Sequence, residues 1–266
     1  MKKFARALRR LSADAILERA QAVLGSVVHP MAQRSSPASE VPPYALHPDF
    51  DLDETLENSP LAVASVAGLV SPEIPLTEDD LWITYEVHRR QALVLTVDTS
   101  LSMTGEKLAL TAVALAVVLL QFPEDPIGIV AFENQAAVIK RPDERISVHD
   151  LVERFLDVPA QGYTHLEDGM LEALAQVRHV TAAGLKRKPS TVLLTDGKYT
   201  AGRDPAYLAS RFPHLVVLKM GHERASLELC RELARKGKGS LLEVGELDEL
   251  PSVMYTVVKD ILRGRG

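Results

Sequence analysis

Residues 94–103 read VLTVDTSLSM, an apolar run that ends in an aspartate and two serines. The run is short, rich in β-branched residues and followed by polar ones, so residues 92–97 are predicted to form a buried strand. Asp98 then lies at the carboxyl end of that strand, where open α/β sheets place their ligand sites. Ser100 and Ser102 follow at alternate positions, so one carboxylate and two hydroxyls can converge on one point. Such oxygen donors suit a hard cation such as Mg²⁺.

Two later stretches add similar donors. Residues 190–198 read STVLLTDGK, which indicates a second buried strand that ends in Asp196, with Gly197 allowing a tight turn. Residues 161–166 read QGYTHL and open a predicted helix, with Thr164 near its start. If the two strands are neighbours in a parallel sheet, Asp196 and Thr164 face the same ion as the donors of the first loop.

This order of motifs resembles the metal-ion-dependent adhesion site of the von Willebrand factor A (VWA) family. The pattern is D-x-S-x-S, then a threonine at a helix start, then T-D-G, and the resemblance extends from about Gln91 to the C-terminus. It implies three direct hydroxyl ligands and two carboxylates that bind the ion directly or through water: Ser100, Ser102, Thr164, Asp98 and Asp196. The expected ion is Mg²⁺, with Mn²⁺ and Ca²⁺ as alternatives. Leu101 stands where the family often has glycine, which should alter the rim of the site.

A ligand set rich in neutral hydroxyls leaves the bound ion with uncompensated charge, so the ion favours a further anionic ligand. We therefore expect a protein partner that supplies a glutamate or aspartate side chain through a charge-assisted contact. The residues that adjoin the ligands are predicted to form a rim around the ion that touches this partner: Leu101, Met103, Tyr163, His165, Lys198 and Tyr199.

A second, shorter resemblance concerns the type of partner. The segment D-L-x-x-T-L at Asp51, Leu52, Thr55 and Leu56 is followed by D-D-L at residues 79–81. This order is similar to the D subunit of magnesium chelatase and to bacterial VWA proteins that work with MoxR-type AAA+ ATPases. The resemblance implies an adaptor that acts with such an ATPase, or with its client, in metal insertion or complex assembly.

Strands alternate with helices over the C-terminal two thirds of the chain, which predicts an α/β fold with a mostly parallel sheet covered by helices on both faces. The VWA resemblance implies the same Rossmann-like arrangement. Residues 1–29 are predicted to hold an amphipathic helix, and residues 30–80 a Pro- and Ser-rich linker and extended arm. Residues 81–266 are predicted to form the VWA domain, which opens with a half-buried strand at Leu81–Val87.

The composition favours a cytoplasmic protein that binds no nucleic acid. The chain has 266 residues, 46% of them hydrophobic, and its formal net charge of −6 argues against a surface that attracts nucleic acid. The apolar run at residues 112–120 is too short to cross a bilayer, and the basic N-terminus lacks the apolar core of a signal peptide. The single cysteine, Cys230, excludes an intramolecular disulfide and is predicted to be a small core residue.

The motifs give less support to an enzyme. Phosphoaspartate phosphatases also have a strand-end aspartate followed by hydroxyls, but they need a second aspartate two positions on, where this chain has Ser100. The sequence contains no G-x-S-x-G elbow, phosphate loop, G-x-G-x-x-G or H-E-x-x-H motif. We therefore expect no enzymatic activity. The alternatives are a metal-dependent hydrolase or phosphatase, and a structural adaptor whose metal site is vestigial.

Overall fold

The computed structural model describes residues 2–23, 31–43, 45–58, 77–88, 91–159, 162–182, 188–221 and 226–263. The chain divides into two compact units, a large unit of residues 1–28 and 90–266 and a small unit of residues 29–89. Among the helices in the described ranges, none is both long and apolar enough to cross a membrane.

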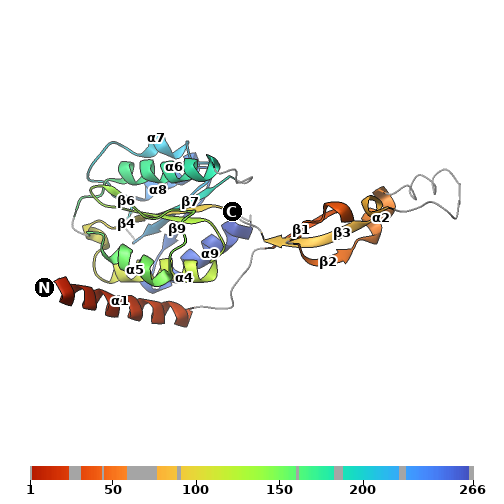
Figure 1. The fold of residues 1–266 in the computed structure, drawn as a ribbon. Helices are drawn as coiled ribbons and strands as arrows, with labels where there is room; N and C mark the ends of the chain where they lie inside the picture. The colour runs from red at the N-terminus through yellow and green to blue at the C-terminus, as the bar shows by residue number, and fades with distance from the viewer. Residues whose placement is uncertain are drawn as a thin grey trace, which may run out of the picture. The chain divides into compact units, whose positions relative to one another are not determined.

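A six-stranded sheet forms the centre of the large unit (Figure 1). Its strand order is β6-β5-β4-β7-β8-β9. The strands are β4 (Leu93–Asp98), β5 (Ile127–Phe132), β6 (Ala136–Lys140), β7 (Ser190–Thr195), β8 (Leu215–Met220) and β9 (Leu241–Val244). Neighbouring strands run parallel except β5 and β6, which form an antiparallel pair. This arrangement confirms the predicted α/β fold with a mostly parallel sheet.

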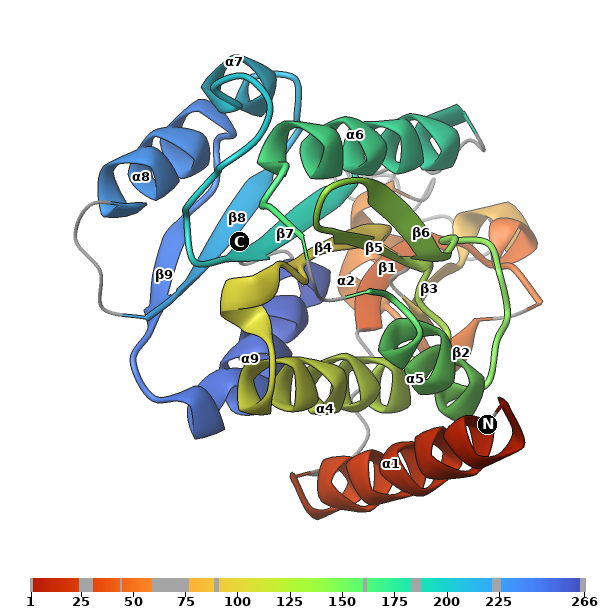
Figure 2. The same cartoon turned by 90° about the vertical axis from the view of Figure 1, so that its left-hand side faces the viewer.

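Helices lie on both sides of this sheet (Figures 1 and 2). On one side are α1 (Lys2–Val23), α4 (Glu106–Gln121), α5 (Val148–Leu156) and α9 (Leu250–Arg263). On the other side are α6 (Leu166–Ala182), α7 (Ala206–Ala209) and α8 (Leu227–Lys236). Helix α1 contacts α4, α5 and α9. Helix α4 is apolar nearly all round, and it is accordingly enclosed by the sheet and these neighbouring helices.

The side chains of each central strand alternate between two hydrophobic cores. Leu93, Leu95 and Val97 of β4 pack in the core beside α4 and α9, whereas Val94 packs in the core beside α6. Burying one such side chain stabilises the fold by about 1.5–3 kcal/mol. A one-residue slip would exchange the two faces of the strand, so this burial fixes the strand register. The register in turn fixes the place where β4 ends and Asp98 begins the next loop.

Helix α1 joins the large unit mainly through small side chains. Ala13 and Ala20 are fully buried, and Ile16 is nearly so. The Arg19 guanidinium also lies 2.8 Å from a carboxylate oxygen of Asp248. The helix therefore belongs to the packed structure of the large unit over the residues whose side chains are described.

Over its described residues, the small unit contains a three-stranded antiparallel sheet, with β3 (Trp82–His88) between β1 (Met31–Pro37) and β2 (Leu46–Phe50), and the α-helix α2 (Leu52–Asn58). The structure differs here from the expectation drawn from the sequence. The strand expected to open the VWA domain is β3 of the small unit, and parts of the expected linker at residues 30–80 form β1 and β2. The reason is that β3 pairs along both of its edges with these two segments and not with the large sheet.

The polar residues of the D-L-x-x-T-L segment hold the small unit together. Asp51 accepts hydrogen bonds from the Thr84 hydroxyl at 2.6 Å and from the backbone N–H of Glu54 at 3.1 Å, which caps the start of α2. The buried Thr55 hydroxyl accepts a hydrogen bond from the backbone N–H of Trp82 at 2.8 Å. These contacts give the segment a structural role that is independent of any partner.

Candidate metal centre

The predicted ligands lie at the carboxyl edge of the two central strands of the large unit. Strand β4 ends at Asp98, and Asp196 directly follows β7, which pairs with β4 in parallel. Ser100 and Ser102 lie in the loop after β4, and Thr164 lies just before α6. Because parallel neighbours end at the same edge of a sheet, the structure brings these segments together as the sequence analysis expected.

Hydrogen bonds of ordinary length order the loop after β4. The backbone N–H of Ser100 donates to Oδ1 of Asp98 at 2.9 Å, and the Thr195 hydroxyl donates to Oδ2 at 2.9 Å. The hydroxyls of Ser100 and Ser102 are 3.2 Å apart. One carboxylate and two hydroxyls therefore lie within one compact turn.

The other two loops contact this turn. The backbone N–H of Leu101 lies 3.4 Å from the carbonyl oxygen of Gly162, close to Thr164. Asp196 is 6% exposed, and its Oδ1 accepts a hydrogen bond from the backbone N–H of Lys198 at 3.0 Å. Gln161, which begins the predicted QGYTHL stretch, lies outside the described residues.

The Asp98 carboxylate is placed at an electrostatic cost. Asp98 is fully buried, and this burial raises its pKa to about 6; the nearby negative charge of Asp196 adds to the rise, while the hydrogen bonds from Ser100 and Thr195 oppose it. The hydrogen bonds described above come to both carboxylates from neutral hydroxyl and backbone groups. A cation between them would favour the charged form of Asp98. The donor set of carboxylate and hydroxyl oxygens therefore fits a hard divalent ion.

Gly197 allows the turn that follows Asp196. Its φ of +77° lies in the left-handed region that side chains rarely adopt. A Cβ at this position would lie 2.6 Å from Sγ of Cys230 and 2.8 Å from Cβ of Ser226. Cys230 is buried, and burial raises the pKa of its thiol to about 11. The prediction of Cys230 as a small core residue is confirmed, and this residue packs against the turn at Gly197.

Three of the six predicted rim residues are large, exposed and apolar or aromatic. Leu101 is 64% exposed, Tyr163 69% and Tyr199 40%, and each comes from a different loop of the site. Lys198 is also exposed. These residues offer a surface around the predicted ligands.

The prediction of Met103 as a rim residue is wrong. Its side chain is fully buried in the core beside α4, because the short 3₁₀ turn Leu101–Met103 directs Leu101 outward and Met103 inward. His165 is half-buried, and its Nδ1 lies 3.1 Å from the carbonyl oxygen of Asn134. The His165 ring therefore packs against the neighbouring turn and stays partly exposed, and its place in the rim remains a prediction.

The sequence analysis gave no role to Thr195, the first residue of the T-D-G motif, although it supports both carboxylate loops. Its hydroxyl donates to Asp98 and accepts a hydrogen bond from the backbone N–H of Gly197 at 3.1 Å. A hydroxyl side chain at the end of a buried strand, directly before Asp196, was the available signal. Thr195 thus joins the first loop to the third.

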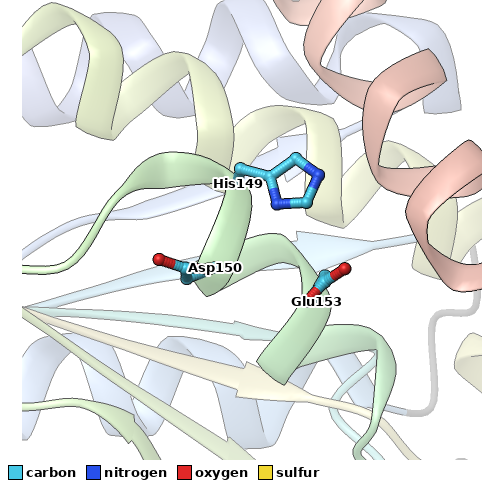
Figure 3. Close-up of side chains that lie close together, drawn as sticks. All are labelled: His149, Asp150 and Glu153. Carbon is cyan, nitrogen blue, oxygen red and sulfur yellow. The ribbon is translucent and has the colours of Figure 1, made fainter. Parts of the chain in front are cut away.

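A second group of ligating side chains lies on α5: His149, Asp150 and Glu153 (Figure 3). One ligand atom from each lies within 4.8 Å of the others. Asp150 and His149 have structural partners that fix their side chains. The Asp150 carboxylate accepts a hydrogen bond from the Ser147 hydroxyl at 2.7 Å where the helix begins, and Nε2 of His149 lies 3.4 Å from the Asp14 carboxylate of α1.

Residues 93–198 match the von Willebrand factor type A domain family. This part of the large unit is therefore similar to VWA domains. The match spans the loops that carry Asp98, Thr164 and Asp196, and it ends just after the T-D-G motif. VWA domains commonly bind a divalent metal at an adhesion site and mediate contacts between proteins. Among curated proteins, none matches the sequence.

Solved structures share the VWA fold at low sequence identity. Proximal thread matrix protein 1 from the mussel byssus, described with zinc in its adhesion motif, has a TM-score of 0.52 and 17% identity, covering 66% of this chain and 48% of its own. A von Willebrand factor type A protein from Catenulispora acidiphila has a TM-score of 0.51 and 15% identity, covering 90% and 51%. An aerotolerance-related membrane protein from Bacteroides fragilis has a TM-score of 0.50 and 14% identity, covering 64% and 99%. The chain thus spans about half the length of the first two proteins, and the likeness shows the fold.

Proposed function

We propose that the VWA domain binds a divalent cation, Mg²⁺ in the cell, and that this ion bridges to a carboxylate of a partner protein. The observation that carries the proposal is the burial of Asp98 and Asp196 at one sheet edge with hydrogen bonds from neutral groups. Two buried carboxylates repel each other, and a cation between them removes that cost. The proposed ligands are Asp98, Ser100, Ser102, Thr164 and Asp196.

The chemistry of these ligands supports both the choice of ion and the partner's carboxylate. Hydroxyl and carboxylate oxygens are hard donors that suit Mg²⁺, with Mn²⁺ and Ca²⁺ as alternatives, and the mussel protein shows zinc in a VWA adhesion motif. Three of the five proposed donors are neutral hydroxyls. The bound ion therefore attracts a further anionic ligand, which a glutamate or aspartate of a partner would supply.

The exposed side chains around the site support a protein partner. Leu101, Tyr163 and Tyr199 are large enough to bury apolar area on contact, and exposed tyrosines are frequent in protein interfaces. We propose that they form the contact rim, together with Lys198. The partner would thus present an acidic residue flanked by apolar surface.

The resemblance of the small unit supports the finer proposal that the partner is a MoxR-type AAA+ ATPase or its client. In this proposal the protein is a cytoplasmic adaptor in metal insertion or complex assembly, and it has no catalytic activity of its own. Asp51 and Thr55 of the D-L-x-x-T-L segment hold the fold of the small unit, whereas Leu52 and Leu56 are exposed.

Calorimetric titration with Mg²⁺ and Mn²⁺ tests the metal site. We expect saturable binding by the wild-type chain and by His149→Ala, and no binding by Asp98→Ala. Binding by Asp98→Ala, or its loss in His149→Ala, would place the ion elsewhere and overturn the proposal. Phosphate-ester hydrolysis by the wild type that Asp98→Ala abolishes would favour a hydrolase instead. Partner binding that survives chelation would favour an adaptor with a vestigial site.

A further inference from the structure

We infer that Thr200 and Glu167 are positioning residues of the VWA site: they fasten the loop after Asp196 to the start of α6, so that Thr164 and Asp196 are presented as one unit. This inference rests on the proposed metal site and adds residues that no sequence motif marks. We call the contacting residues Thr164, Glu167, Thr200, Arg203 and Tyr207 the outer clasp.

The first part of the outer clasp joins Thr200 to Thr164 from both directions. The backbone N–H of Thr164 donates to the Thr200 hydroxyl at 2.9 Å. The backbone N–H of Thr200 donates back to the Thr164 carbonyl at 3.0 Å, and that of Ala201 lies 3.3 Å from the same oxygen. These contacts use the backbone of Thr164, so its side-chain hydroxyl takes no part in them. The hydrogen bonds to the Thr164 backbone therefore position its hydroxyl, the proposed ligand, without bonding to that hydroxyl.

The second part of the outer clasp is centred on Glu167, in the first turn of α6. Its Oε2 accepts a hydrogen bond from the backbone N–H of Arg203 at 2.8 Å, and its Oε1 accepts one from the Tyr207 hydroxyl at 2.5 Å. The Glu167 side chain is only 13% exposed. One carboxylate therefore ties the far end of the Asp196 loop and the start of α7 to the same helix that follows Thr164.

Close packing supports this arrangement beside the hydrogen bonds. Gly202 has a φ of +84°, and a Cβ there would lie 2.4 Å from the imidazole ring of His165. Two further hydrogen bonds go to the turn after β5. The backbone N–H of Tyr163 donates to Oδ1 of Asn134 at 2.8 Å, and that of His165 donates to the Glu133 carbonyl at 2.7 Å. The backbone around Thr164 is therefore held between the turn after β5 and the loop after β7.

The outer clasp also sets the spacing of the two exposed tyrosines. Tyr163 precedes Thr164 and Tyr199 precedes Thr200, so the hydrogen bonds between the two threonines fix the backbones that carry both rings. Loosening the outer clasp should therefore weaken metal binding and disturb the proposed contact rim in the same variant.

The test compares Thr200→Val, which keeps the shape but removes the hydroxyl, with Thr200→Ser, which restores it. Mg²⁺ affinity is measured by calorimetry, and the water bound to Mn²⁺ is measured by proton relaxation. We expect Thr200→Val to bind Mg²⁺ about three- to five-fold more weakly, the effect of one hydrogen bond, and Thr200→Ser to recover most of this loss. Bound Mn²⁺ in Thr200→Val should carry more water, because Thr164 no longer holds its place.

Two further variants keep the test decisive. Tyr207→Phe removes only the hydrogen bond to Glu167 and should weaken Mg²⁺ binding about two-fold or more. Thr181→Val is the matched control, because the Thr181 hydroxyl donates within α6, to the carbonyl of Val177 at 2.8 Å, away from the outer clasp. Wild-type affinity and Mn²⁺ hydration in both Thr200→Val and Tyr207→Phe would overturn the inference. A wild-type chain that binds neither ion would instead overturn the proposed function on which the inference rests.

Discussion

The carboxylates at the sheet edge and those on α5 lie in opposite environments. Asp98 is buried, with hydrogen bonds from a backbone N–H and a hydroxyl, whereas Asp150 and His149 lie toward the surface and have a capping partner and an ionic partner. Both groups bring ligating atoms close together, as Figure 3 shows for α5. The difference teaches that proximity alone does not indicate a metal site. The stronger indication is negative charge that the fold has buried and left uncompensated.

The largest expected difference between variants of the two groups is in how much Mg²⁺ stabilises the folded protein. An ion that binds only the folded state at 100 times its dissociation constant raises the free energy of unfolding by about 2.7 kcal/mol. We expect this gain, read as a higher melting temperature by circular dichroism, in the wild type and in His149→Ala. Asp98→Ala should gain nothing. An equal gain in all three proteins would mean that Mg²⁺ acts away from the sheet edge.

The second-largest expected effect is the dependence of the free energy of unfolding on pH in the absence of metal. The pKa of Asp98 lies near 6, above the ordinary value of 3.8, so its contribution to stability is present below about pH 4 and is lost as the pH rises through 6. At pH 7 the charge costs up to about 3 kcal/mol. Asp98→Asn removes the charge but also the acceptor of the Thr195 hydroxyl, worth about 1 kcal/mol, which leaves a net gain of about 2 kcal/mol.

Urea unfolding in EDTA at pH 5 and at pH 7.5 measures this gain. The advantage of Asp98→Asn over the wild type should grow with pH. A constant difference between the two proteins would show that the charge of Asp98 is already compensated in the fold.

Among substitutions on α5, the largest loss of stability should come from removing the residue that caps the start of the helix, Ser147. The Ser147 hydroxyl accepts a hydrogen bond from the backbone N–H of Asp150 at 3.0 Å. Ser147→Ala should lower the free energy of unfolding by about 1 kcal/mol. Ser252→Ala, at an exposed position in the first turn of α9, is the control. Mg²⁺ affinity should stay unchanged in Ser147→Ala, and its loss would give the α5 group a role in ion binding.

The smallest change in stability is expected when the ion pair between His149 of α5 and Asp14 of α1 is removed. The His149 and Asp14 side chains are 32% and 65% exposed, and such pairs contribute less than about 1 kcal/mol. His149→Ala should therefore unfold in urea close to the wild-type midpoint, as should the control His179→Ala, whose pair with Asp143 is also exposed. A large loss in His149→Ala alone would show that this contact anchors α1.

The sequence predicted the elements that carry a strong pattern. The strands before Asp98 and Asp196 are buried throughout and mostly aliphatic or β-branched, so their type and their ends were recognisable, and the ligand-bearing loops followed from the topology of a parallel sheet. The small sheet was not recognisable. Its strand β1 reads MAQRSSP, which lacks an alternating apolar pattern, and it is defined by pairing with β3 far along the chain.

The supporting residues of the site could not be found in the same way. Glu167 and Tyr207 meet because α6 and α7 lie on the same side of the sheet, and no sequence spacing records that contact. Met103 was instead wrongly assigned to the exposed rim. Its position beside the ligands suggested exposure, but the turn Leu101–Met103 decides the direction of each side chain.

The packing of Cys230 against Gly197 has a consequence for the evolution of the chain. The two positions share one small volume, since even a single added methyl group at Gly197 would overlap the Cys230 sulfur. The positive φ of Gly197 already keeps that position glycine, so residue 230 has to remain small unless α8 shifts. Homologous sequences should therefore keep a small residue at position 230 wherever they keep the glycine, and a larger residue there could displace the loop after Asp196 without touching any proposed ligand.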